Sequence, residues 1–590
     1  LSLILALCII ISFSPSTLAA NLPEVDVRTE GLTPAQPQEA PAEKPRDAGA
    51  ERRTIYVSNE GTEEDDGATA ETPTTLARAT ELANEGKKPV EIVVLGQVSV
   101  DTWTSPTVET TLRGGDENAE LLFEYCSASD GAYNISLADA LTIDDIKFNC
   151  NYTDYFFSRY YGTYTIVANG YPLVIASGVQ YSYYTADTIV DGKTCSTSSC
   201  YVIGGGLDED ITGGTHVEIY TSLPLTYVYG GGVNGSVEGN IFLHIENCGK
   251  IQHVRAGGYA NKKDAKVNGN ITLDFINSVT DNPIYGGGYA RSSYSAEVTG
   301  SICINLSGLN NGFGRPIYGG GYEKNAPVVG NITFNISNTK MNNNAAAIYG
   351  GGYNSDVTGD IFIHIKENSL ISEETVWGGG TGDSTITGGV TITVDDSTEV
   401  IGEIRAGGNE GADVIGDVVI TVSGGPQSAC PTIFATGKGE DEDNPAQVDG
   451  NVSITLHGSR ANVYTLDKFG EVTSDHTVTI ILDDTDELSG AVRGDSKLGQ
   501  HLYNYEKNTP TRTGNGASVI VKGDYTSTGI HGFPEVVIED GGILREHLAS
   551  GETLFDGVET VTIQEGGALD LLQSNEISGN FTCAGTLKMP

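Results

Sequence analysis

Basic, sulfur-containing and indole side chains are scarce in this sequence. Its 590 residues include 33 Lys and Arg against 78 Asp and Glu, giving a formal net charge of −45, and they include only 2 Met and 2 Trp. Because so acidic a chain is repelled by a phosphate backbone, nucleic acid is not an expected partner. The 9 cysteines contain no Cys-x-x-Cys pair, which argues against a structural zinc site.

Long apolar runs are also missing, except at the start of the sequence. An apolar stretch from Leu1 to Phe13 is followed by Ser and Pro and then by Ala19 and Ala20. This stretch is too short to span a membrane, and the pattern predicts a signal peptide over 1–20 that is truncated at its own start. The protein is therefore expected to be secreted or held at a cell surface, with no membrane span in this fragment.

Two further expectations concern the cysteines and the segment that follows the predicted signal peptide. Without Cys8 an even number of cysteines remains, so disulfides are permitted, and Cys195 and Cys200 are the pair close enough in sequence for a local bridge. Residues 21–53 are rich in Pro, Ala and Glu and have no apolar periodicity, which predicts a disordered linker.

Glycine, tyrosine and β-branched residues are abundant, which favours strands and tight turns. There are 76 Gly and 28 Tyr. Near the start of the ordered region, residues 54–61 predict a strand, residues 73–86 predict a short helix capped by Thr74 or Thr75 and stopped by Gly86, and residues 90–95 predict a second strand.

An internal repeat organises the middle of the chain. The motif V-x-G-(N/D/S/G)-φ-x-φ-x-φ, where φ is apolar, recurs with its Gly at 213, 239, 269, 300, 330, 359, 388, 416 and 450, about every 30 residues. The position two before this Gly is aliphatic in every unit, and the position two after it is aliphatic in every unit except the first, which has Thr215. Alternation after the Gly, as in Ile271, Leu273 and Phe275, predicts a half-buried strand of about nine residues in each unit.

A second, Gly-rich signature lies between these strands. It reads VIGGGL from 202, VYGGGV from 228, VRAGGY from 254, IYGGGY from 284, 317 and 348, VWGGGT from 376 and IRAGGN from 404. Identical positions that recur once per turn predict a solenoid whose coils pair in parallel about 4.8 Å apart. The period is too long for a calcium β-roll and too short for a propeller.

We therefore expect an all-β chain, a right-handed parallel β-helix solenoid with a short N-terminal capping helix. Residues 54–200 form the cap and first coils, 201–457 form a nine-repeat core, and 458–590 form less regular coils that continue beyond the fragment. The similar segments 536–544 and 561–569 belong to these later coils.

Two resemblances accompany this pattern. Residues 54–100, with YVS, an acidic Gly loop, Pro73, Thr75-Leu76 and an Ala-rich helix before a β-run, resemble the N-terminal cap of pectin-lyase-like β-helix proteins, and 141–149 (LTIDDIKFN) resembles one of their coils. The cap implies a helix that covers the open first coil. The IYGGGY and VxGNI repeats resemble those of large, non-enzymatic bacterial surface proteins, which implies a structural stalk or adhesin.

Stacked aromatic residues form the candidate binding surface. In the Gly-rich strands, the aromatic residues that point away from the aliphatic column are expected to lie on the outer surface, beside a second line of Tyr residues. A linear glycan could bind along these rings. The alternative is that the rings stack only to stabilise the fold. The proposed binding residues are Tyr285, Tyr318, Tyr349, Trp377, Tyr289, Tyr322, Tyr353, Arg255 and Arg405. Along one turn, Asn240, Asn270, Asn331 and Asn451 predict an amide ladder.

Catalysis is not the expected role, although a polysaccharide lyase or glycoside hydrolase is the alternative function. The enzymes of the pectin-lyase-like family that this chain resembles cleave acidic polysaccharides. They use calcium-binding carboxylates with an Arg base, or grouped Asp residues. Doublets such as Asp144-Asp145 point to opposite strand faces, and no catalytic residues are proposed. An enzyme should show three or more carboxylates clustered in one lateral groove, whereas an adhesin should show aromatic rails with no such cluster.

Cofactors and remaining partners follow from the same residues. No cofactor or metal site is proposed; calcium is the cation that would suit the acidic loops 63–67, 207–214 and 439–444, for which solvated negative surface is the alternative. His216, His244 and His364 are expected to be ordinary surface histidines. The expected partner is an extracellular glycan or a host or cell-wall surface.

Overall fold

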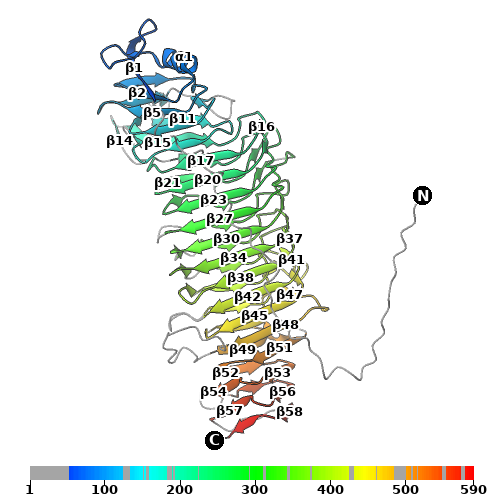
Figure 1. The fold of residues 1–590 in the computed structure, drawn as a ribbon. Coiled ribbons are helices and arrows are strands. Elements are labelled where there is room, and N and C mark those ends of the chain that lie inside the picture. The colour runs from blue at the N-terminus through cyan, green and yellow to red at the C-terminus, as the bar shows by residue number, and fades with distance from the viewer. Residues whose placement is uncertain are drawn as a thin grey trace, which may run out of the picture.

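Parallel strands make up most of the regular secondary structure of the described residues. The computed structural model describes residues 52–123, 133–149, 152–154, 159–181, 189–190, 193–223, 225–291, 293–309, 314–341, 346–371, 375–400, 402–423, 431–459, 461–483, 500–506, 509–513, 516–547, 553–572 and 579–589. The predicted signal peptide, linker and Cys8 lie outside these residues. The described coils share two long sheets, here called sheets 1 and 2, and between residues 211 and 472 they also pass through a third, called sheet 3. The coils stack from the blue end to the red end of Figure 1.

Sheet 1 has 19 strands among the described residues, and successive members pair in parallel. Its strands are β1 (Arg53–Thr62), β2 (Val90–Val94), β5 (Thr110–Gly114), β8 (Leu141–Asp144), β12 (Leu173–Ile175), β17 (Thr215–Ile219), β20 (Ile241–Glu246), β23 (Ile271–Ile276), β27 (Ile302–Ser307), β30 (Ile332–Ser337), β34 (Ile361–Lys366), β38 (Val390–Val394), β42 (Val418–Ser423), β45 (Val452–His457), β48 (Val478–Asp483), β51 (Ala517–Val521), β53 (Glu535–Ile538), β56 (Thr560–Ile563) and β58 (Asn580–Cys583).

Sheet 2 contains the Gly-rich signature and has 23 described strands. They are β4 (Trp103–Thr104), β7 (Ile135–Ser136), β10 (Tyr152–Asp154), β11 (Arg159–Val167), β14 (Ile189–Val190), β15 (Lys193–Ile203), β18 (Leu225–Tyr229), β21 (Lys250–Arg255), β24 (Val279–Thr280), β25 (Ile284–Tyr285), β28 (Ile317–Tyr318), β32 (Ile348–Tyr349), β36 (Thr375–Trp377), β40 (Glu403–Arg405), β43 (Thr432–Phe434), β46 (Asn462–Leu466), β49 (Gln500–Glu506), β50 (Thr509–Thr513), β52 (Asp524–His531), β54 (Ile543–Glu546), β55 (Phe555–Asp556), β57 (Ala568–Asp570) and β59 (Thr586–Lys588).

Sheet 3 and several small sheets line the corners. Sheet 3 consists of β16 (Ile211–Thr212) and β19 (Val237–Glu238), then β29 (Val328–Val329), β33 (Val357–Thr358), β37 (Thr385–Thr387), β41 (Asp413–Ile415), β44 (Ala446–Asp449) and β47 (Gly470–Val472), with single bridges at Val267 and Val298 between the two groups. The small sheets contain β3 (Gln97–Val100), β6 (Glu120–Phe123), β9 (Lys147–Asn149) and β13 (Gln180–Tyr181); β22 (Tyr259–Ala260) and β26 (Tyr289–Ala290); and β31 (Lys340–Met341), β35 (Leu370–Ile371) and β39 (Glu399–Val400).

The repeat motif places its aliphatic residues in the interior, as predicted. Ile271, Ile302 and Ile332 are register partners in successive coils, and all are buried. One apolar cluster of this kind runs from Ile55 to Leu571. Thr215, the exception in the column, is also buried, and its hydroxyl donates to the Gly230 carbonyl at 2.8 Å, so the polar atom is satisfied. The fold is therefore a parallel β-helix with a continuous core.

The predicted nine-residue strand is wrong in one respect, because the motif Gly divides it between two sheets. In one coil β41 ends at Ile415, Gly416 turns the corner with φ 152°, and β42 begins at Val418. A Cβ at Gly416 would lie 2.6 Å from the carbonyl carbon of Gly388, the equivalent residue one coil earlier. Glycine is needed here because stacked corners bring backbone against backbone.

Side chains at the same corner form the predicted amide ladder. Oδ1 of Asn240 accepts the backbone N–H of Asn270 at 2.9 Å, and Oδ1 of Asn270 accepts that of Ser301 at 2.8 Å. Oδ1 of Asn331 accepts the N–H of Asp360 at 2.9 Å, and Asp360 continues the ladder. The ladder thus joins side chain to backbone, coil by coil.

The N-terminal helix α1 (Leu76–Gly86) packs on the first coil. Its buried residues Leu76, Ala79, Leu82 and Ala83 join the main core, and it lies at the blue end of the stack (Figure 1). Thr75 is the N-cap, as predicted, and accepts the Arg78 N–H at 3.1 Å. Gly86 was expected to stop the helix, but Gly86 is helical and Lys87 adopts the left-handed conformation that ends it.

Later coils follow the same plan. The segments 536–544 and 561–569 supply register-paired strands β53 with β56 and β54 with β57. Among the described residues, no helix is long and apolar enough to cross a membrane.

Candidate functional site

The predicted aromatic column exists as an unbroken stack of rings. Tyr285, Tyr318, Tyr349 and Trp377 are register partners in successive strands of sheet 2. Their ring centroids are 5.2, 4.8 and 5.8 Å apart along the series, with interplanar angles of 7°, 12° and 7°. We call these four residues the inner ladder. They form a cluster separate from the main core, so they point away from the aliphatic column, as expected.

The inner ladder is not an exposed surface. Its members are only 5–9% exposed, because Tyr289, Tyr322 and Tyr353 pack against it as a second, outer ladder. Tyr289 and Tyr322 stack on each other at 4.2 Å, and Tyr322 meets Tyr285 edge to face at 5.4 Å.

This packing changes the glycan hypothesis. A sugar ring would need an open aromatic face, but the faces in both ladders are directed along the stack and covered by neighbouring rings. The expectation of an open aromatic groove is therefore not met, and the ladders act as packing that ties successive coils together.

Arg255 and Arg405 occur at the two ends of the inner ladder, as the repeat predicted. Both are at least nine-tenths buried. Arg405 lies against Trp377 and Phe434, with its guanidinium carbon 4.8 and 4.1 Å from the ring centroids. Burial lowers the pKa of Arg405, and the nearby Glu403 carboxylate opposes this effect.

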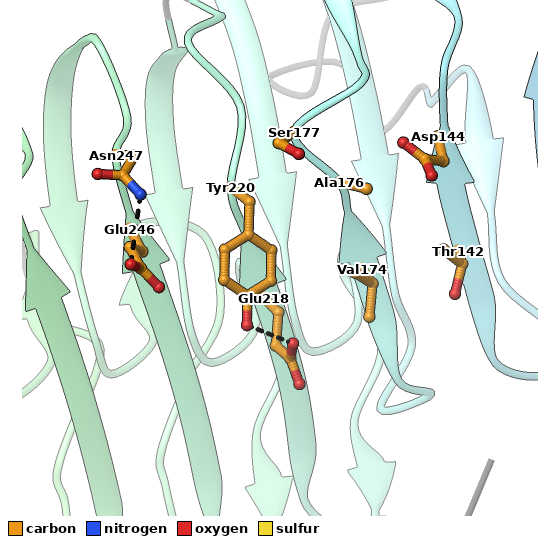
Figure 2. A pocket seen from close by; sticks show the side chains of 9 residues that line it. All are labelled: Thr142, Asp144, Val174, Ala176, Ser177, Glu218, Tyr220, Glu246 and Asn247. Atoms are coloured by element: carbon orange, nitrogen blue, oxygen red, sulfur yellow. Dashed lines mark hydrogen bonds between the residues drawn. The ribbon is translucent and has the colours of Figure 1, made fainter.

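A pocket of about 520 Å³ opens on the outer face of sheet 1, over strands β8, β12, β17 and β20. Figure 2 shows the carboxylates of Asp144, Glu218 and Glu246 along it, together with Tyr220 and Asn247. Carboxylates from different coils line the same pocket because outward positions of parallel strands align across the sheet. Three carboxylates thus line one lateral groove, which was expected of an enzyme and not of an adhesin.

Glu218 is held in place by two neighbours, one on its own strand and one directly after it. His216 Nε2 and the Tyr220 hydroxyl lie 2.6 and 2.8 Å from its carboxylate oxygens. The hydrogen bond from His216 outweighs partial burial and lowers the pKa of Glu218. Glu218 is therefore ionised near neutral pH, which suits an electrostatic or hydrogen-bond acceptor role and not that of a proton donor.

His244 bridges two other carboxylates beside the pocket. Its Nε2 lies 3.2 Å from Glu246, and its Nδ1 lies 3.1 Å from Asp274 one coil further on. Burial alone would lower the pKa of His244, but the hydrogen bonds to Asp274 and Glu246 outweigh burial and raise it. His216 and His244 do lie at outward strand positions, but they are part of a polar network and are mostly covered, so they are not ordinary surface histidines.

The carboxylates are not arranged as a close catalytic pair. Strand β12 lies between β8, which carries Asp144, and β17, which carries Glu218. Two strand spacings separate these residues by about 10 Å along the sheet. Of the doublet Asp144-Asp145, Asp144 lines the pocket, whereas Asp145 adopts φ 45° in the following turn. The pocket offers acceptors to a polar or cationic ligand, without an evident acid–base couple.

The remaining predicted sites fall elsewhere. Cys195 and Cys200 belong to one strand, β15, and the side chain of Cys195 lies outside the described residues. Five residues of strand span about 16 Å, whereas a disulfide needs Cα atoms about 4.4–6.8 Å apart, so the strand disfavours their pairing. In the acidic loops, Asp65 accepts from Thr62 and Asp441 from the Asp443 N–H; within the described residues no group of three potential ligands lies close enough to hold a metal ion.

Sequence reasoning did not single out Glu218, Glu246 and Asp274. The signal available was strand parity, since all three are outward positions in strands that follow the repeat motif. Comparisons with known proteins give no further guide: no family model, no curated protein and no solved structure matches this chain.

Proposed function

We propose that this chain is an exported β-helical stalk or adhesin of a cell surface, of the Gly-rich, pectin-lyase-like kind. One observation carries the proposal: a single core runs from Ile55 to Leu571 with ladders stacked on it, so that each coil extends the same rod. Such a solenoid gains length without changing its cross-section, which is the physical requirement for a spacer. The apolar leader over 1–20 supports export.

If the rod also binds a surface, the pocket on sheet 1 is a better contact than the aromatic ladders. The pocket presents Asp144, Glu218 and Glu246 to the outside, whereas the ladder rings are covered. The ligand it suits is a glycan or peptide that offers hydroxyl or ammonium donors, because carboxylates accept hydrogen bonds. A strongly acidic polymer would be repelled by the net charge of −45.

A polysaccharide-cleaving enzyme is the second candidate, and the three pocket carboxylates are the observation that favours it. An enzyme would cleave a polysaccharide substrate repeatedly, whereas a stalk or adhesin would not. We would incubate the intact chain with polygalacturonate and with neutral polysaccharides, and measure new reducing ends and unsaturated products.

For a stalk or adhesin we expect no turnover, with or without added calcium. The matched variants are Glu218→Gln in the pocket and Asp65→Asn in a distant loop. Turnover that is lost in Glu218→Gln and kept in Asp65→Asn would show that the protein is an enzyme and would contradict the stalk or adhesin proposal.

A further inference from the structure

The two arginines that end the inner ladder have different surroundings. Arg405 is paired with carboxylates: its Nη2 lies 2.6 Å from Glu403, and its Nη1 pairs with Asp467. A buried guanidinium is costly to desolvate, and such partners compensate for its charge. Arg405 therefore has an internal explanation.

Arg255 is buried to a similar extent, with 6% of its surface exposed, but its partners are aromatic. Its guanidinium carbon lies 3.5 Å from the ring centroid of Tyr289, 4.9 Å from that of Tyr259 and 5.4 Å from that of Tyr229. Within the described residues no carboxylate pairs with Arg255, and its Nη1 donates to the Tyr229 hydroxyl at 3.2 Å. The buried Nε has no acceptor in either arginine, so the two differ in the carboxylates that pair with Arg405.

Stacking leaves the edges of this guanidinium unused. A ring over the guanidinium takes up its flat face, whereas its five N–H groups point outward in the plane. One of those five donates to a protein acceptor. An oxyanion in the plane would accept from the others in the bidentate geometry that arginine prefers.

The neighbouring charges also favour an anion. The exposed Arg291 hydrogen-bonds to Tyr259, which brings a second cation to the aromatic rings around Arg255. His253 stacks on Tyr227 at 4.6 Å, and burial together with Arg255 lowers the pKa of His253 to about 4, so it carries no charge at neutral pH. The Asp281 carboxylate also acts on His253, so this spot combines two cations, Arg255 and Arg291, with one nearby carboxylate, on a chain whose net charge is −45.

We propose that Arg255 anchors a binding site for a single oxyanion group, a carboxylate, sulfate or phosphate carried by a small ligand. Tyr259 and Tyr289, which are half-buried, flank the guanidinium and would line the entrance. The overall negative charge restricts the ligand to one or two charges, because a polyanion would be repelled along the rod. This inference goes beyond the proposed function and does not rest on it, since a stalk, an adhesin or an enzyme could each contain such a site.

Calorimetric titration of the intact chain tests the site. The probes are glucuronate, sulfate and inorganic phosphate, which distinguish the three oxyanions, with glucose as the neutral control. We expect at least one anion to bind with a Kd of about 1 mM or tighter and glucose to give no heat. The preferred anion identifies the group.

Variants show whether Arg255 carries the binding. Arg255→Gln should abolish the heat, and Arg255→Lys, which keeps the charge and loses the planar fork, should weaken binding by about tenfold. The exposed Arg315 provides a control, since Arg315→Gln should bind as the original chain does. Circular dichroism of every variant shows whether it is folded; if Arg255→Gln is unfolded, Arg255→Lys decides. No binding by the original chain to any of the three anions, or full binding by a folded Arg255→Gln or Arg255→Lys, would overturn the proposal.

Discussion

At the scale of single residues, hydrogen-bond partners and neighbouring charges give two histidines of similar burial opposite pKa shifts. His244 and His253 are nine residues apart on consecutive strands, β20 and β21. His244 lies between two carboxylates that raise its pKa, whereas His253 is equally half-buried but lies beside Arg255, and its pKa is lowered to about 4. The two residues therefore serve as controls for each other.

We predict that His244 and His253 respond to pH in opposite directions. In the unfolded chain both titrate near pH 6.5. A raised folded pKa means that the His244 charge stabilises the fold below that pH and that this contribution is lost as pH rises through the folded value. His244→Gln should therefore lower the melting temperature more at about pH 5 than at about pH 8.

The His253→Gln substitution should have the opposite pH dependence and should favour the folded state more at about pH 5 than at about pH 8. Because His253 resists protonation in the fold, it destabilises the protein as pH falls below about 6.5, and its replacement removes that penalty at acid pH. Hydrogen–deuterium exchange at the imidazole C–H, followed by mass spectrometry, reports both pKa values in the unmodified chain. If His253 titrated at or above His244, the assigned environments would be wrong.

At the scale of elements, ladders connect one coil to the next, and each ladder uses one interaction. At the corner between sheets 3 and 1, side-chain oxygens accept the backbone N–H of the following coil. Position 301 carries Ser and position 360 carries Asp, so the ladder requires an acceptor and not a particular residue. On sheet 2, the interaction is ring stacking.

Replacing an amide in the corner ladder should loosen the next coil locally. Asn331→Ala removes the acceptor for the Asp360 N–H and should cost about 1 kcal/mol. Asn331→Ser keeps a hydroxyl acceptor, as Ser301 does one coil earlier, and should cost less. Hydrogen exchange of the Asp360 amide is the measurement, and equal exchange in Asn331→Ala and the original chain would argue against the ladder's role.

In the inner ladder, the ring should matter and the hydroxyl should not. Tyr318 stacks between Tyr285 and Tyr349 at 5.2 and 4.8 Å. Tyr318→Phe keeps both stacks and should leave the melting temperature unchanged. Tyr318→Leu keeps an apolar side chain but loses both stacks, and should cost about 1 kcal/mol or more.

A melting temperature that falls equally in the two Tyr318 variants would assign the stabilisation to the hydroxyl. An unchanged value in both would show that the stacking contributes nothing measurable.

At the scale of the whole molecule, the repeat predicted the β-helix, because equivalent residues such as Ile271, Ile302 and Ile332 occupy the same core position in successive coils. The corner at Gly416 was not predicted, since alternation continues across it and hides the change of sheet. Side-chain burial on the outer face was not predicted either. Strand parity shows that Tyr318 points outward, but it does not show that the outer ladder covers it.

The polar contacts beside the candidate pocket and at the end of the inner ladder join residues that lie far apart in the sequence. His244 meets Asp274, and Arg405 meets Asp467, across 30 and 62 residues of sequence. These pairs require the register between coils and, for Asp467, the path of a later coil. The sequence therefore indicated which residues face outward, whereas the structure was needed to show which of them meet.

The central claim is that the coils are equivalent units of one rod, and removing whole coils tests it most directly. Deleting residues 240–330 joins Gly239 to Asn331, so the motif V-E-G-N-I is kept and three motif intervals are lost. Small-angle X-ray scattering of both chains should show the same cross-sectional radius and a maximum dimension shorter by about 14 Å, three spacings of about 4.8 Å, with the strand signal in circular dichroism retained. An unfolded product, or a folded product of unchanged length, would contradict the account.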